Sequence, residues 1–119
     1  MKILIADNLP LDQFYLSQII EIIGHHCIIK TNGRDAIDYL KKNSVDVIIL
    51  YAEMSEISGL DVAKHIKTEM KLKTPLIAIT AHCFDDYKKK IINAGFDYTL
   101  IKPFLIDDLA VILKVIQSA

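Results

Sequence analysis

Short apolar runs alternate along the chain with longer segments in which apolar residues recur every three or four positions. The runs cover residues 3–6, 27–29, 45–50, 76–79 and 96–101. They are rich in apolar and β-branched residues and lack the polar alternation of a strand with one face in water, as is typical of strands covered on both faces. The pattern predicts five interior strands of a parallel sheet.

The segments between these runs have the spacing of amphipathic helices. The clearest apolar stripe covers residues 16–23 and ends before Gly24, a residue favoured where helices terminate. Shorter or later stripes begin at Ala36, Val62, Phe84 and Leu109. Five strands alternating with five helices predict a doubly wound α/β fold, in which right-handed helical crossovers join parallel strands.

The composition narrows both the size and the class of the protein. A chain of 119 residues accommodates one domain. Its 14 basic and 15 acidic residues give a net charge of −1, which argues against nucleic acid or an anionic membrane as the main partner. Apolar runs stay far below the roughly 20 residues of a membrane span, and no secretory signal follows Met1. We therefore expect a cytoplasmic location, with Cys27 and Cys83 as reduced thiols.

Polar residues follow four of the five predicted strands. Asp7 and Asn8 follow the first, Tyr51 the third, Thr80 the fourth and Lys102 the fifth. In open parallel sheets, ligands bind outside the carboxyl ends of the strands, near the point where the strand order reverses. An acid, an amide, a phenol, a hydroxyl and an amine are therefore expected at one edge of the sheet.

Several segments in order resemble the receiver domain of two-component response regulators. They are ILIADN at residues 3–8, DVIIL at 46–50, EISGLDV at 56–62, PLIAITAH at 75–82, AGFD at 94–97 and KPF at 102–104. The resemblance covers essentially the whole chain, and the segment around residues 57–60 is most similar to stand-alone receivers of cell-cycle phosphorelays. It implies a single domain over residues 1–119, a flavodoxin-like (βα)5 three-layer sandwich with strand order 2-1-3-4-5.

The family uses its strand ends for phosphoryl transfer. An aspartate at the end of the third strand accepts the phosphoryl group from a histidine kinase, and two acidic residues after the first strand hold Mg²⁺. A hydroxyl and a lysine contact the acyl phosphate, and an aromatic residue three positions before the lysine responds to it. By this resemblance Asp7, Thr80 and Lys102 keep the expected residue types.

Three positions depart from the family pattern. Asn8 replaces the second acid, Tyr51 replaces the acceptor aspartate, and Thr99 replaces the switch aromatic. A phenol with a pKa near 10 stays protonated at neutral pH, and an aryl phosphate is not a labile acyl phosphate. The pocket is therefore predicted to be degenerate, with no catalytic residue and no enzyme activity.

The lost acids also change the expected charge of the pocket. Asp7 and Lys102 could pair directly, so we expect no cofactor and weak or absent Mg²⁺ binding. Two interpretations of Tyr51 remain open. In the first, it fills the pocket and hydrogen-bonds to Lys102, Thr80 or water; in the second, its ring mimics a permanently switched state. Glu53 is a further candidate, as a substitute phosphoacceptor.

Together with the resemblance, these departures imply a pseudo-receiver that acts as a phosphorylation-independent interaction module in a bacterial two-component pathway. The expected interaction face spans the fourth helix, fifth strand and fifth helix, and includes Lys88, Lys89, Tyr98 and Asp107. Its expected partners are a histidine kinase, an output domain or a second copy of the chain, and neither nucleic acid nor a membrane.

Two alternatives remain open. The first is a working phosphoacceptor of the same fold that uses a non-standard residue. The second is a flavodoxin-like small-molecule binder at the switch point of the sheet. The second lacks a glycine-rich loop after residues 3–6, which a phosphate-binding strand end normally has.

Overall fold

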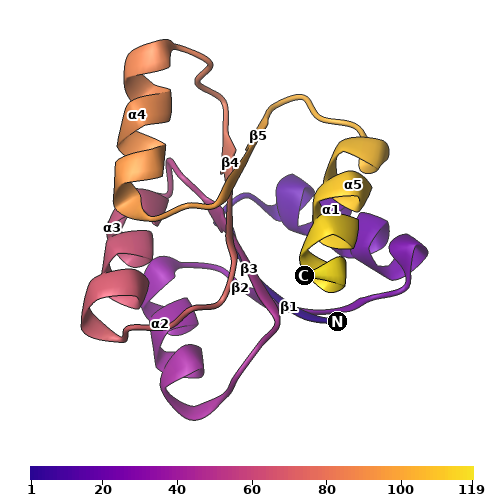
Figure 1. Ribbon diagram of the computed structural model, residues 1–119, viewed down its shortest axis with the longest axis horizontal. Coiled ribbons are helices and arrows are strands. Elements are labelled where there is room, and N and C mark those ends of the chain that lie inside the picture. The colour runs from indigo at the N-terminus through magenta and orange to yellow at the C-terminus, as the bar shows by residue number, and fades with distance from the viewer.

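The five apolar runs form one parallel sheet in the computed structural model, which describes residues 1–119 (Figure 1). The strands are β1 (Lys2–Ala6), β2 (His26–Lys30), β3 (Val47–Tyr51), β4 (Leu76–Thr80) and β5 (Tyr98–Ile101). Their order is β2-β1-β3-β4-β5 and all four neighbouring pairs are parallel, which confirms the predicted order.

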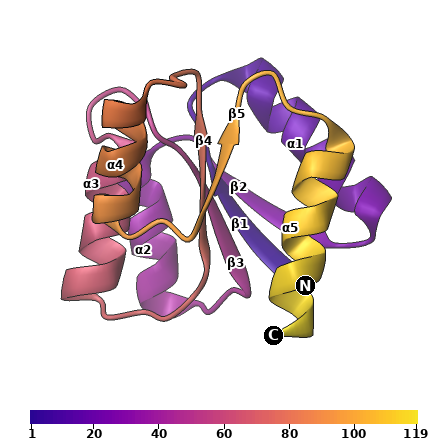
Figure 2. The same ribbon diagram turned by 45° about the horizontal axis from the view of Figure 1, so that its top comes forward.

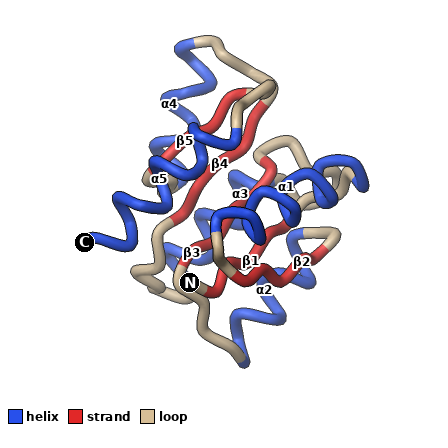
Figure 3. Tube along the Cα trace, turned by 90° about the vertical axis from the view of Figure 1, so that its right-hand side faces the viewer, coloured by secondary structure: helices blue, strands red, loops and turns tan.

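Helices cover both faces of the sheet. On one side lie α1 (Pro10–Ile23) and α5 (Ile106–Ser118), and on the other α2 (Gly33–Lys42), α3 (Gly59–Lys64) and α4 (Asp85–Ala94) (Figure 2). A π-helical turn, η1 (His65–Glu69), continues α3. The tube in Figure 3 shows the same strands enclosed between the helical layers. The three-layer sandwich is confirmed.

Alternate residues of each strand enter two separate cores. Leu4 and Ile48 are fully buried against the α2, α3 and α4 layer, whereas Ile5, Ile49 and Ile77 are fully buried against α1 and α5. Each such side chain contributes about 1.5 to 3 kcal/mol by leaving water. Because both faces of the strands are covered, neither set of alternate positions is polar, and this produces the continuous apolar runs.

The ends of several predicted elements are shifted. β3 begins at Val47 rather than at residue 45 and includes Tyr51, so the phenol belongs to the last position of the strand. β5 begins at Tyr98 rather than at residue 96, because Phe96 packs into the core beside α4 instead. Asp97, which lies between Phe96 and Tyr98, accepts a hydrogen bond from the Leu76 backbone amide at 2.9 Å. Apolar character alone did not separate a buried loop residue from a strand.

No helix of the structure combines the length and the apolar content needed to cross a bilayer.

Candidate functional site

The strand register brings the polar strand-end residues to one edge of the sheet. Ala6 pairs with Leu50, Tyr51 with Ile79, and Thr80 with Ile101, so β1, β3, β4 and β5 end at nearly the same level. Each polar residue occupies or follows one of these ends. The predicted convergence of an acid, an amide, a phenol, a hydroxyl and an amine is what this register produces.

Lys102 is paired with a residue that the sequence prediction missed. Its ammonium group forms an ion pair with Asp12 in the first turn of α1, and both side chains are about three-quarters buried. The expected direct pair between Asp7 and Lys102 is wrong. The Asp7 carboxylate accepts a hydrogen bond from the Leu9 amide, whereas Asp12 lies in the first turn of the helix that follows β1. A polar residue in the first turn after a functional strand end is the signal that could have found Asp12.

The ring of Tyr51 also faces Lys102. The Lys102 Nζ atom lies 4.2 Å from the ring centroid, close enough for a cation–π interaction worth about 0.5 to 1 kcal/mol. Burial raises the pKa of the Tyr51 hydroxyl above its ordinary value of 10, although Lys102 opposes the shift. The phenol is therefore protonated at neutral pH. Tyr51 thus contacts Lys102 through its ring face, and its hydroxyl makes no hydrogen bond to Lys102 or Thr80.

Asp7 is the most deeply buried acid of the chain, at 1% exposure. Its Oδ1 atom accepts a hydrogen bond from the Leu9 amide at 2.9 Å, while Oδ2 has no donor. Burial raises the pKa of this carboxyl to about 6, and the nearby Asp12 adds to the shift while the Leu9 amide and Lys102 oppose it. Asp7 therefore takes up its proton at a higher pH than an ordinary aspartate does.

The Thr80 hydroxyl donates a hydrogen bond to Glu53, which lies on the loop after β3. The Thr80 Oγ1 to Glu53 Oε2 distance is 2.8 Å, and the other carboxylate oxygen accepts the Ala81 amide at 2.8 Å. The Tyr87 hydroxyl of α4 donates to Glu53 as well, at 3.0 Å. Burial and this bond raise the pKa of Tyr87 to about 12. Glu53 lies two residues beyond Tyr51, in the turn that follows β3.

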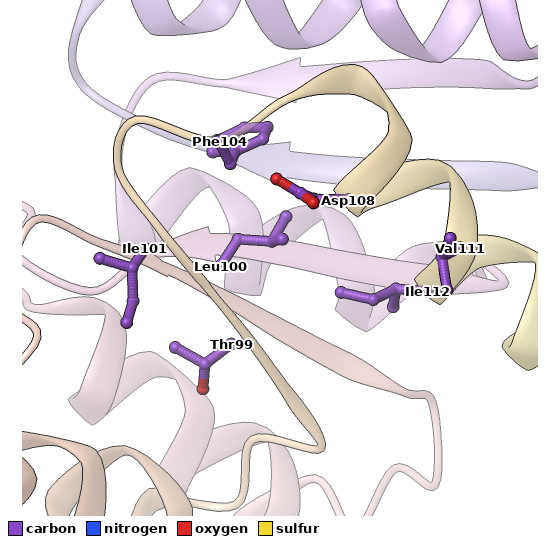
Figure 4. Close-up of a pocket in the computed structure, with 7 residues that line it drawn as sticks. All are labelled: Thr99, Leu100, Ile101, Phe104, Asp108, Val111 and Ile112. Atoms are coloured by element: carbon purple, nitrogen blue, oxygen red, sulfur yellow. The ribbon is translucent and has the colours of Figure 1, made fainter.

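The predicted switch position and interaction face lie around β5. Thr99 is half-buried and lines a shallow hollow of about 400 Å³ beside α5 (Figure 4). Tyr98 is also half-buried, and it packs against the core on the α1 and α5 side. Lys88, Lys89 and Asp107 are exposed. The side chains of Lys88, Lys89 and Asp107 are thus more accessible to a partner than that of Tyr98.

The donor set at the end of β1 fits a Mg²⁺ ion poorly. Asp7 Oδ2 and Asn8 Oδ1 are buried acceptors without a donor, but only Asp7 carries a charge, and Asp12 is already paired with Lys102. No group of three acidic, histidine or cysteine side chains is arranged to hold a metal. Mg²⁺ strongly prefers carboxylates in a near-octahedral site.

We therefore expect millimolar Mg²⁺ to leave the amide chemical shifts of Asp7, Asn8 and Tyr51 unchanged in an NMR titration. A receiver domain with two acidic residues after β1 and an acceptor aspartate serves as the positive control. Saturable shifts at these three amides, at Mg²⁺ concentrations that shift the control, would overturn the expectation.

Comparison with known proteins identifies the family. The family described as response regulator receiver domain matches residues 3–114. Curated relatives include the sensor histidine kinase RcsC of Salmonella typhi, 28% identical over 97% of this chain and 12% of its own length. Another is the hybrid signal transduction histidine kinase H of Dictyostelium discoideum, 30% identical over 96% of this chain and 9% of its own length. The chain thus spans about a tenth of these relatives.

Solved structures agree with the sequence match. A two-component response regulator from Clostridium difficile superposes with a TM-score of 0.92 at 27% identity, over 99% of this chain and 96% of that one. The receiver domain of a Francisella response regulator gives a TM-score of 0.91 at 25% identity, over 98% and 96% of the two chains. The chain is a member of the response regulator receiver domain family.

Proposed function

We propose that this receiver domain works as a phosphorylation-independent protein-interaction module of a bacterial two-component pathway, in the cytoplasm. The observation that carries the proposal is the state of the pocket. The position of the acceptor aspartate holds Tyr51, and the two groups that would contact a phosphoryl group, Thr80 and Lys102, are bound to Glu53 and Asp12.

This arrangement opposes phosphoryl transfer in two ways. The Tyr51 phenol is protonated and lacks the labile acyl chemistry of an aspartyl phosphate. An incoming phosphoryl group would also have to displace two internal carboxylates and would meet their negative charge at short range. Both effects favour a chain that keeps one state instead of cycling between two.

Glu53 is a poor substitute nucleophile, because its carboxylate is already engaged by hydrogen bonds. Its two carboxylate oxygens accept three hydrogen bonds, from Thr80, Ala81 and Tyr87. These bonds occupy both carboxylate oxygens, which a nucleophile would need free. The geometry therefore supports Glu53 as a structural anion and not as a phosphoacceptor.

The proposed partner surface is the face formed by α4, β5 and α5. It carries exposed Lys88 and Lys89 on α4, exposed Asp107 on α5 and half-buried Tyr98 on β5. Val111 of α5 is 62% exposed. Exposed charges around an apolar centre are the usual composition of a protein interface. The histidine kinase relatives suggest a kinase or an output domain as the partner, and self-association through the same face is the third possibility.

The test compares affinities for purified histidine kinase and output domains, and for the chain itself, with and without acetyl phosphate and Mg²⁺. We expect the Kd of the partner to stay within about twofold when the phosphodonor is added, and to weaken about tenfold in Lys88→Glu/Lys89→Glu. Lys41→Glu/Lys42→Glu, which changes two exposed lysines of α2, is the matched control. Binding that requires acetyl phosphate would contradict the proposal.

A further inference from the structure

The first half of α4 and the loop before it have little contact with the rest of the protein. Every residue from Ala81 to Lys90 is exposed except Tyr87, which is half-buried. The helix has no side-chain cap at its N-terminus, and its buried residues, Ile91 and Ala94, belong to its second half. Within this segment, Tyr87 and the backbone of the loop are therefore the groups best placed to attach it to the rest of the protein.

Both attachments lead to one side chain. The Tyr87 hydroxyl donates to Glu53 Oε2 at 3.0 Å, and the Ala81 amide donates to Glu53 Oε1 at 2.8 Å. The Thr80 hydroxyl, which also donates to Glu53, accepts the His82 amide at 3.0 Å and so extends the contact by one residue. The His82 ring packs on Tyr87 with their centroids 4.8 Å apart.

We propose that Glu53 is a positioning residue that clasps the β4–α4 loop and the first half of α4 against the loop after β3. A single carboxylate joins three elements, since Glu53 follows β3, Thr80 ends β4 and Tyr87 lies on α4. The clasp holds Lys88 and Lys89 in one arrangement without a phosphoryl group. It rests on the proposed function, because it explains how that interaction face is presented permanently.

The chemistry of the contact favours a stable clasp. Hydrogen bonds to an ionised carboxylate are shorter and stronger than bonds between neutral groups. Glu53 is half-buried, so water competes less for its oxygens than it would at the surface. The Tyr87 ring adds apolar contact with the core on this side of the sheet, which keeps its hydroxyl aimed at Glu53.

The test is amide hydrogen exchange of the isolated chain, read by NMR or mass spectrometry. Glu53→Ala is expected to accelerate exchange of the protected amides in residues 85–92 about tenfold, while β1 and β3 keep their protection. Tyr87→Phe, which keeps the ring and removes one donor, is expected to give about threefold. Glu53→Gln, which keeps the length and can still bond both hydroxyls, is expected to lie between wild type and Glu53→Ala.

Glu69→Ala and Tyr39→Phe are the matched controls. Glu69 is exposed, and the Tyr39 hydroxyl makes no hydrogen bond to another side chain. The exchange rates of both variants are expected to stay within about twofold of wild type. Equal exchange in Glu53→Ala and Glu69→Ala would overturn the proposal, as would acceleration spread evenly over the whole sheet. The measurement uses neither partner nor phosphodonor. Its outcome is therefore separate from the test of the phosphorylation-independent function.

Discussion

Replacing Asp7 with Asn is expected to raise the free energy of unfolding at about pH 8 by about 2 kcal/mol. The wild-type carboxyl is 1% exposed, its Oδ2 atom has no donor, and its pKa is raised from 3.8 to about 6. An ionised Asp7 is therefore costly in the folded state. An amide keeps the acceptor that binds the Leu9 backbone and removes the charge.

The sign of the pH dependence follows from the raised pKa. Because the folded protein binds this proton more tightly than the unfolded chain does, the contribution of Asp7 to stability falls as the pH rises from about 4 to above 6. Urea unfolding at about pH 4.5 and pH 8 should thus show a small difference between Asp7→Asn and wild type at the lower pH and the full gain at the higher one.

Asp38→Asn, which changes an exposed carboxylate of α2, controls for the general loss of negative charge and is expected to change stability by less than about 0.5 kcal/mol at either pH. A loss of stability in Asp7→Asn at the higher pH would show that the charge of Asp7 is compensated, and would contradict this account of the pocket.

Replacing Gly59 with Ala is expected to lower the free energy of unfolding by about 3 kcal/mol. Gly59 is the first residue of α3, and it lies next to the backbone at the end of β3. A Cβ atom there would lie against the Tyr51 carbonyl oxygen and 2.8 Å from the Ala52 Cα. Both are backbone atoms and cannot rotate away, so the loop that carries Glu53 would have to move. The hydrogen bond from the Gly59 amide to the Ala52 carbonyl, at 3.0 Å, would be strained as well.

Gly33→Ala is the matched control, because Gly33 is also a buried glycine at the first position of a helix. Its added Cβ would meet the tip of the Val62 side chain at 2.5 Å, which can shift. We expect a cost below about 1.5 kcal/mol there, measured by urea unfolding alongside Gly59→Ala. Equal costs at the two positions would show that the approach of α3 to β3 is not the constraint.

The sheet could be predicted from the sequence because a strand buried on both faces is apolar at every position. Residues 3–6 and 76–79 are apolar at every position, and the strands there match the prediction to within one residue. The strand-end residues followed from the same reasoning, since parallel strands end at one edge. Phe96 was misplaced because a buried loop residue and a strand residue carry the same apolar signal.

The partners within the pocket could not be predicted, because they depend on side-chain reach between elements distant in sequence. Asp12 and Lys102 are 90 residues apart, and the choice of Asp12 over Asp7 depends on how α1 leaves β1. Glu53 and Tyr87 are 34 residues apart and meet only once α4 is placed. The tyrosine at position 51, by contrast, was visible in the sequence as a single residue type at a known spacing.

Intact-mass spectrometry after incubation with acetyl phosphate and Mg²⁺ tests directly whether this chain accepts a phosphoryl group. A receiver domain with an aspartate at the position of Tyr51 is treated in parallel, to show that the conditions phosphorylate a competent acceptor. Because the phenol is protonated and Glu53 and Asp12 hold the groups that would bind the phosphoryl oxygens, we expect an unchanged mass for this chain. A gain of one phosphoryl group would contradict it.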